Sequence, residues 1–105
     1  MDLDVLLKEC QQLYQARFYT TNESGSTRTA VICYQEVLKQ EQNHADARNG
    51  LETIENYYIR RANQDLARGK LGNVKIWLTG LKKVNPDSPT LAKLKVQYQS
   101  ALDAR

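Results

Sequence analysis

The sequence lacks both long apolar runs and alternating patterns of apolar and polar residues. No apolar stretch in the 105 residues approaches the roughly 18 that a membrane-spanning helix needs, which excludes such a span. Val, Ile and Thr are scattered rather than alternating, and the only prolines are Pro86 and Pro89, so strands have little support. We therefore predict an all-α fold.

Residues that carry catalysis or metal binding are equally scarce. His44 is the only histidine, and no cluster of cysteines or carboxylates stands at ligand spacing from it. The chain also has no Gly-rich phosphate loop, no Gly-x-Ser-x-Gly motif and no Cys-x-x-Cys pair. We predict that the protein is not an enzyme, that it binds no metal or cofactor, and that His44 is a turn residue.

The remaining composition is that of an ordinary globular chain. A hydrophobic content of 41% allows a core to form, and 105 residues correspond to a single domain over residues 1–105. The first residues, Met1-Asp2-Leu3-Asp4, lack the basic and apolar regions of a signal peptide, so we expect a cytoplasmic protein. A domain cut from a longer chain would look the same.

Charge is distributed unevenly along the sequence. Residues 1–55 carry five basic and nine acidic side chains, a net charge of −4, whereas residues 56–105 carry ten basic and three acidic ones, a net charge of +7. Such asymmetry can mark a surface for nucleic acid or for an acidic partner. The alternative is two solvated faces of opposite sign.

Apolar residues spaced three and four apart predict five amphipathic helices, and the first two are separated by a polar loop. We expect Asp2 to cap the first helix and Ser26 or Thr27 to cap the second. We expect residues 20–29, which lie between these helices, to be the most mobile internal segment. The two apolar stripes are Leu3, Leu6, Leu7, Cys10, Leu13, Tyr14 and Phe18, and then Ala30, Cys33, Tyr34, Val37 and Leu38.

The third predicted helix is overlong, because its apolar stripe continues without a break for about twenty residues. Asn43 is the expected N-cap. Gly50 lies inside this helix at a cost of roughly 1 kcal/mol relative to Ala, so we interpret it as a position of close packing against the second helix. The stripe consists of Ala47, Leu51, Ile54, Tyr58, Ala62 and Leu66.

Two further helices complete the pattern. Gly69 ends the third helix and Asn85-Pro86 ends the fourth, whose start is poorly capped because Lys70 stands at the cap position. Asp87-Ser88-Pro89, a polar cap followed by proline in the first helical turn, then starts a fifth helix that covers the last apolar face. The apolar residues are Leu71, Val74, Trp77, Leu78, Leu81 and Val84 in the fourth helix, and Leu91, Leu94, Tyr98 and Leu102 in the fifth.

The stretch from Tyr58 to Pro86 resembles the tetratricopeptide repeat (TPR). Counted back from Pro86 as the closing proline, the small residue of the first helix of the repeat falls on Ala62 and its turn glycine on Gly69. The apolar positions of its second helix fall on Val74, Leu78 and Leu81, and Ala30, Cys33, Tyr34, Val37 and Leu38 match the second half of an earlier repeat.

The resemblance covers roughly three quarters of the chain and departs from the family pattern in two ways. Ala30 and Val74 are 44 positions apart where a strict array repeats every 34, and Gln42 stands where the closing proline of the earlier repeat would be. The resemblance implies TPR-like α-α hairpins joined through the overlong third helix. It also implies a non-enzymatic interaction scaffold that binds a protein or peptide or assembles subunits or domains. Self-association is a further expected mode of interaction.

A polar face of the third helix is the candidate binding site. Asn49, Asn56, Arg60 and Asn63 lie opposite the core stripe, within about one fifth of the helical wheel of each other. The resemblance places Arg60 and Asn63 at positions that many TPR domains turn toward a peptide. Amides can pair with a peptide backbone and a guanidinium with a carboxylate, so an acidic peptide suits this face. The alternative is a solvated polar face.

Two further sets of residues have two interpretations each. Cys10 and Cys33 should lie at similar heights on antiparallel helices, where they could approach each other. We predict that they are reduced core residues, as is normal in an intracellular chain. Tyrosines and basic residues interleave in Tyr57-Tyr58-Ile59-Arg60-Arg61, which suits stacking on nucleic acid. The helical wheel places aromatic and charged residues mostly on different faces, so nucleic-acid or polyanion binding is the alternative function.

Overall fold

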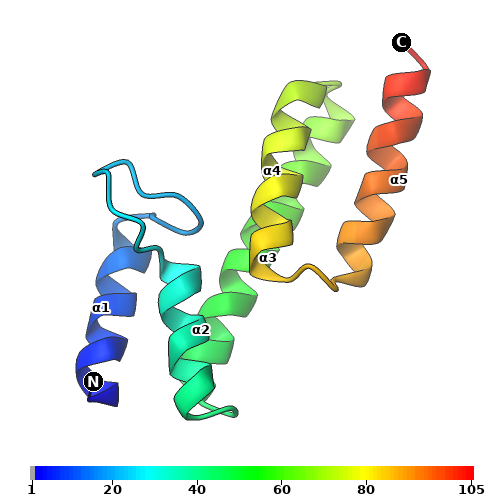
Figure 1. Ribbon diagram of the computed structural model, residues 1–105. Helices are drawn as coiled ribbons and strands as arrows, with labels where there is room; N and C mark the ends of the chain where they lie inside the picture. The colour runs from blue at the N-terminus through cyan, green and yellow to red at the C-terminus, as the bar shows by residue number, and fades with distance from the viewer. Residues whose placement is uncertain (1) are drawn as a thin grey trace. The chain divides into compact units, whose positions relative to one another are not determined.

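The computed structural model describes residues 2–105, and in that range the chain forms helices and no strand, which confirms the all-α prediction. The helices are α1 (Leu3–Gln15), α2 (Ala30–Gln40), α3 (Ala45–Ala67), α4 (Leu71–Val84) and α5 (Pro89–Asp103), in the order drawn in Figure 1. Within the described range, no helix has the length and apolar character needed to cross a membrane.

The chain divides into two compact units, Met1–Ile54 and Glu55–Arg105. The first contains α1, α2 and the beginning of α3, and the second contains the rest of α3 together with α4 and α5. The single domain expected over residues 1–105 stays a prediction.

The first unit is built on a hairpin of α1 and α2, which lie side by side in Figure 1. Tyr34 of α2 packs directly over Gly50 of α3, so the close approach predicted at this glycine is confirmed. The buried apolar residues are Leu6 and Cys10 of α1, Ala30, Val31, Cys33, Tyr34 and Val37 of α2, and Ala47 and Ile54 of α3.

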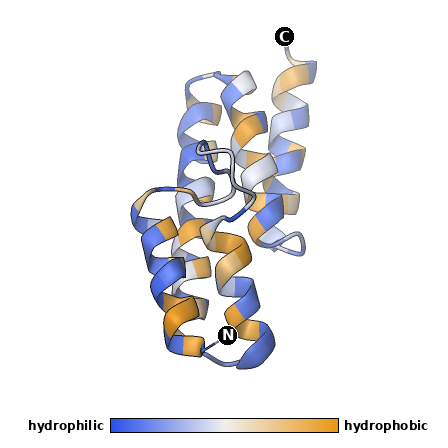
Figure 2. Ribbon diagram, turned by 60° about the vertical axis from the view of Figure 1, so that its left-hand side comes forward, coloured by the Kyte–Doolittle hydropathy of each residue, from blue (hydrophilic) through white to orange (hydrophobic). Residues whose placement is uncertain are grey.

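The second unit has its own core, formed by one stripe from each of its helices. Figure 2 shows hydrophobic positions recurring between hydrophilic ones along the helices. Leu78 keeps only 7% of its surface exposed, so the predicted burial at this position is confirmed. The buried apolar residues are Tyr58 and Ala62 of α3, Leu71, Val74, Leu78, Leu81 and Val84 of α4, and Leu91 and Leu94 of α5.

The α3 stripe differs from its prediction at two positions. Leu51 and Leu66, which were expected in the core, are only half-buried. Asp65 takes an inward position instead and keeps only 8% of its surface exposed. At 100° per residue, Asp65 lies between Ile54 and Tyr58 on the wheel, whereas Leu66 lies at the edge of the buried arc.

Helix caps agree with the sequence at α1, α4 and α5. Asp2 accepts a hydrogen bond from the Asp4 N–H at 3.1 Å, and Ser88 accepts one from the Leu91 N–H at 3.2 Å. Lys70 makes no side-chain bond at the start of α4, as expected for a basic residue. Packing of the apolar stripe of α4 therefore has to hold that helix in place.

Two predicted caps are wrong by one to three positions. Thr29, not Ser26 or Thr27, caps α2 and accepts a hydrogen bond from the Ile32 N–H. His44, not Asn43, lies next to the start of α3 and accepts a hydrogen bond from the Ala47 N–H at Nδ1, at 3.4 Å. The imidazole of His44 can replace an Asn here because its unprotonated nitrogen is an acceptor. The interpretation of His44 as a turn residue is confirmed.

The segment from Ala16 to Thr29 is held by its own hydrogen bonds. The N–H groups of Ala30 and Val31 donate to the carbonyls of Phe18 and Tyr19, at 2.8 and 3.1 Å. The Asn22 amide donates to the Arg28 carbonyl at 2.8 Å. These bonds fix both ends of the loop and leave residues 23–27 as its exposed tip.

Candidate functional site

The polar face of α3 is exposed, as the sequence predicted. Asn49, Asn56, Arg60 and Asn63 are all exposed. Among residues 2–105, none of their side chains hydrogen-bonds or pairs with another side chain of the chain. Asn49 belongs to the first unit, and the other three belong to the second. We call Asn56, Arg60 and Asn63 the α3 polar face.

The opposite side of the same helix explains why these side chains point outward. Tyr58, Ala62 and Asp65 are buried and fix the rotation of α3 in the second unit. Asn56, Arg60 and Asn63 lie on the far side of the wheel from those three positions. Their backbone is therefore held rigidly by the core while the side chains remain available.

This face has a defined hydrogen-bonding capacity. Arg60 offers a planar guanidinium with five N–H donors, which can hold a carboxylate through two parallel bonds. Asn56 lies one turn before Arg60, and Asn63 lies one turn after it. Each amide can both donate to and accept from a peptide backbone. The three side chains could therefore bind an extended peptide that carries a carboxylate.

Beside this face lies a cluster that the sequence interpretation missed. The guanidinium carbon of Arg61 lies 5.1 Å from the ring centroid of Trp77 and 5.8 Å from that of Tyr57. Trp77 Nε1 donates a hydrogen bond to Asp65 Oδ2 at 2.7 Å, which accounts for the buried carboxylate. Tyr57, Arg61 and Asp65 are spaced by four residues each, and that spacing was the available signal.

The cluster corrects the expectation that aromatic and charged residues mostly occupy different faces. Tyr57 and Trp77 meet edge to face at 6.2 Å, with Arg61 against both rings. The reason is that Arg61 lies next to the core stripe rather than opposite it, so its stem can reach Trp77. These two rings already contact a cation of the chain itself and are not an open platform for stacking bases.

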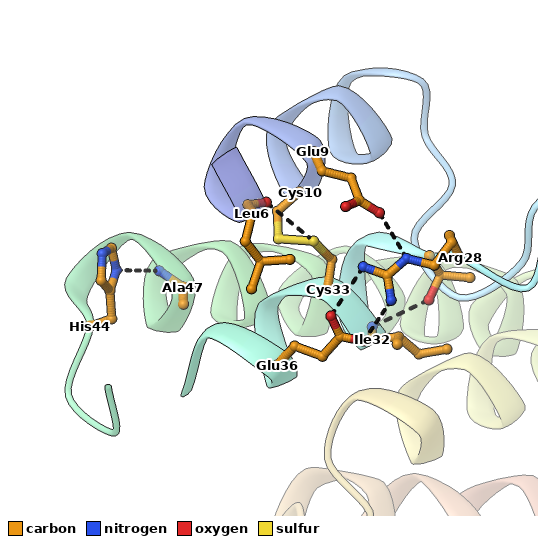
Figure 3. Close-up of a disulfide and its surroundings, with 10 residues drawn as sticks. Leu6, Glu9, Cys10, Arg28, Ile32, Cys33, Glu36, His44 and Ala47 are labelled. Atoms are coloured by element: carbon orange, nitrogen blue, oxygen red, sulfur yellow. Dashed lines mark hydrogen bonds and ion pairs between the residues drawn. A yellow bond between two sulfur atoms is a disulfide. The ribbon is translucent and has the colours of Figure 1, made fainter. Parts of the chain in front are cut away.

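In the first unit, Cys10 and Cys33 form a disulfide between α1 and α2, as Figure 3 shows. This corrects the prediction of two reduced core cysteines. Their Cα atoms are 5.3 Å apart, within the range that a disulfide requires, and both residues are completely buried. The antiparallel hairpin brings the two cysteines to the same height, as expected, and their sulfur atoms are bonded to each other in the core.

An ion-pair cluster lies beside the disulfide. Arg28 donates from Nε to Glu9 of α1 at 2.7 Å and from Nη1 to Glu36 of α2 at 2.6 Å, and Figure 3 shows its guanidinium between the two carboxylates. The hydrogen bond from Arg28 lowers the pKa of Glu36. The hydrogen bonds that Arg28 donates to Glu36 and Glu9 raise the pKa of Arg28. The cluster fastens the end of the loop to both helices.

The structure and the comparisons with known proteins were also searched for a metal site and for relatives. Among residues 2–105, no group of three or more His, Cys, Asp or Glu residues could hold a metal ion. Comparisons with protein-family models, with curated proteins and with solved structures found no match. The function has to be inferred from the residues of this chain.

Proposed function

We propose that this chain is a non-enzymatic protein-interaction scaffold with TPR-like hairpins, and that the α3 polar face binds an acidic peptide or protein. The observation that carries the proposal is a set of three exposed side chains, Asn56, Arg60 and Asn63, which have no side-chain partner within residues 2–105 and lie on a helix whose other side is buried. A rigid helix that presents outward donors is pre-organised, so little entropy is lost when a partner binds.

The charge of the second unit supports an acidic partner. Residues 55–105 contain ten basic and four acidic side chains, a net charge of +6. Of these, Arg61 is held against Trp77, whereas Arg60 makes no ion pair within residues 2–105. A positive surface attracts a negatively charged partner and speeds its encounter, and an unpaired guanidinium can then fix a carboxylate.

Capture of partners from the native source tests this proposal. Three baits are compared: the unchanged chain, the double variant Arg60→Glu with Asn63→Ala, and the control variant Lys75→Glu. Lys75 is an exposed lysine of α4, so its reversal makes the same change of charge on another helix. We expect the double variant to lose a partner that the Lys75→Glu chain retains. Equal capture by all three baits contradicts the proposed face.

Polyanion binding through the basic second unit is the second candidate function, and the net charge of +6 is the observation that favours it. Such binding depends on counterion release, so its affinity falls steeply with salt and ignores sequence. Titration with single-stranded oligonucleotides of unrelated sequence at low and moderate salt distinguishes the two candidates. Equal and strongly salt-dependent binding of all of them favours the polyanion function.

The compartment of the protein also stays a proposal. The cytoplasmic location expected from the sequence is opposed by the Cys10–Cys33 disulfide, because disulfides persist mainly in oxidising compartments. Alkylation of free thiols at the moment of lysis, followed by mass spectrometry, decides between them. Unmodified cysteines in the native protein indicate an oxidising compartment, whereas two alkylated cysteines indicate the cytoplasm.

A further inference from the structure

Residues 56–86, which comprise most of the α3 part of the second unit and all of α4, expose charge of one sign only. Asp65 is their single acidic residue, and it keeps 8% of its surface exposed and accepts a hydrogen bond from Trp77. Their seven basic residues are all exposed: Arg60, Arg61, Arg68, Lys70, Lys75, Lys82 and Lys83. Residues 56–86 therefore offer these cations no exposed carboxylate of their own.

Arg61 differs from the other six because aromatic rings hold its guanidinium. The guanidinium carbon lies 5.1 Å from the ring centroid of Trp77 and 5.8 Å from that of Tyr57. The indole of Trp77 is held in turn, because its Nε1 donates to Asp65 at 2.7 Å. Among residues 2–105, the Arg61 side chain forms no hydrogen bond and no ion pair, not even with Asp65 one turn further along α3.

A guanidinium held against rings is pre-organised to bind a carboxylate. Arginine stacks on aromatic rings through the face of its guanidinium and binds carboxylates through the N–H groups at its edge. Ring contacts therefore leave the N–H groups free to donate. Fixing the side chain before a ligand arrives also lowers the entropy that binding costs.

Arg61 lies beside the α3 polar face without belonging to it. At 100° per residue, Gln64 lies between Arg60 and Arg61 on the wheel. Arg68 continues this side of the helix, since its N–H donates to the Gln64 carbonyl at 3.2 Å. Gln64 and Arg68 are exposed, and no acidic residue among 56–68 shares this arc. A strip of hydrogen-bond donors thus runs from Arg60 to Arg61.

We propose that Arg61 is a second anion-binding residue beside the α3 polar face, and that the partner is an acidic peptide segment with one carboxylate for Arg60 and another for Arg61. Tyr57 and Trp77 are positioning residues, which act by holding the Arg61 guanidinium. The inference rests on the proposed function, because it names a second anionic group on the same partner.

Titration with two synthetic peptides is the first test. Both are hexapeptides with blocked ends, one of six glutamates and the other of six glutamines. Trp77 is the only tryptophan, so its emission reports on ligands at Arg61. We expect hexaglutamate to change the emission saturably below about 1 mM at physiological salt, and hexaglutamine to leave it unchanged. The absence of a saturable change with hexaglutamate, or the same change with both peptides, overturns the inference.

Arg61→Lys separates a placed guanidinium from positive charge alone. This variant keeps the charge and loses the planar fork, so calorimetry should show hexaglutamate binding weakened by about fivefold or more. The matched control is Lys82→Gln, which removes an exposed charge about 140° around the wheel of α4 from Trp77. It should bind within about twofold of the unchanged chain. If Arg61→Lys binds as tightly as the unchanged chain, Arg61 is not an anion-binding residue.

A double-mutant cycle tests whether Tyr57 acts through Arg61. Tyr57→Leu removes the ring and should weaken hexaglutamate binding by about threefold when Arg61 is present, but not in an Arg61→Gln chain. Tyr57→Phe keeps the ring and should restore the affinity. Trp77 stays unchanged, because it is the reporter and the donor to Asp65. An equal effect of Tyr57→Leu in both chains shows that the ring does not act by positioning Arg61.

The double variant Arg60→Glu with Asn63→Ala distinguishes this inference from the proposed function. If the double variant binds hexaglutamate weakly and Arg61→Lys binds it normally, the α3 polar face stands and the inference about Arg61 fails. If Arg61→Lys binds weakly and the double variant binds normally, Arg61 is an anion-binding residue and the α3 polar face is not. Weak binding by both supports the two carboxylates.

Discussion

The ring of Tyr58 lies directly over the backbone of Gly80, so close that a Cβ added to this glycine would come within 2.5 Å of Tyr58 Cε1. Tyr34 lies over Gly50 in the same way, with its Cε2 atom 2.5 Å from such a Cβ. Each unit thus contains a tyrosine of one helix packed on a glycine of the next helix. Glycine lowers helix propensity at these positions, but its lack of a Cβ allows the helices to approach closely.

This packing predicts opposite effects for alanine at two glycines of α4. Gly80→Ala should destabilise the fold by about 1 to 2 kcal/mol, because overpacking against the buried Tyr58 ring exceeds the gain in helix propensity. Gly72→Ala should stabilise it by about 0.5 kcal/mol, since no heavy atom lies within 4 Å of the added Cβ. Urea denaturation measures both, and equal effects of the two changes would contradict the close approach.

The core of the second unit predicts a difference between two large apolar residues of α4. Leu78→Ala should cost roughly 2 to 5 kcal/mol, because it leaves a cavity at a position that is only 7% exposed. Ile76→Ala, at a position that is 61% exposed, should stay within about 0.5 kcal/mol. Thermal melts of both variants test the assignment, and an unshifted melting temperature for Leu78→Ala would show that the register of α4 is wrong.

The disulfide predicts the outcome of limited proteolysis. The exposed tip at residues 23–27 should be cleaved first, and the two fragments should stay linked until a reductant is added, because Cys10 and Cys33 flank the tip. In a Cys10→Ser and Cys33→Ser variant, the cut fragments should separate without reductant in denaturing electrophoresis. Separation of the wild-type fragments without reductant would mean that the disulfide does not form.

Loss of the same disulfide should also lower stability. The bond closes a loop with a sequence separation of 23, for which chain entropy predicts a stabilisation of about 3 kcal/mol. The intact double-serine variant should therefore unfold at lower urea concentration than the oxidised wild type. The wild type under reducing conditions provides the matched comparison. Coincident unfolding curves for all three samples would refute this contribution.

The Arg28 cluster predicts a small loss of stability in acid. The pKa of Glu36 is lower in the folded protein than in the unfolded chain, mainly because Arg28 donates a hydrogen bond to the carboxylate. Its contribution is therefore present above the unfolded pKa of about 4.3 and disappears as pH falls through the folded pKa. The loss should remain under about 1 kcal/mol because the pair is partly exposed. Glu36→Gln should remove this part of the acid dependence in urea titrations at pH 3 to 7. If the dependence of stability on pH is the same in this variant, the ion pair is not the source of the loss of stability in acid.

The sequence was sufficient for the helices because their stripes repeat over several turns, and at Gly50 it also predicted the close contact. The sequence did not predict the burial of Asp65. A carboxylate is stable on the core side only when a hydrogen-bond donor reaches it, and here that donor is Trp77, twelve residues away, whose position the sequence pattern does not give. The prediction that the two cysteines are reduced was wrong for a related reason. Periodicity brought Cys10 and Cys33 to similar heights, but whether two buried thiols are oxidised depends on distance and compartment, which periodicity does not contain.

The candidate site was predictable only in part. Exposure of Asn49, Asn56, Arg60 and Asn63 followed from the helical wheel, since these positions lie opposite the buried stripe. The role of Arg61 did not follow, because its contact with Trp77 depends on how α4 packs against α3. Binding at the exposed face depends on the chemistry of the partner as well as on this chain, so it is tested by measuring affinity for a partner.

The most direct test of the central proposal is a titration of the folded Arg60→Glu and Asn63→Ala variant with a partner recovered by the unchanged chain. Both positions are exposed, so the free energy of unfolding should stay within about 0.5 kcal/mol of the wild-type value. Binding should weaken by about 2 kcal/mol or more, roughly thirtyfold in Kd, because a charge-assisted bond is lost and its charge is reversed. Wild-type affinity in this folded variant would contradict the proposal and show that the α3 polar face is only solvated.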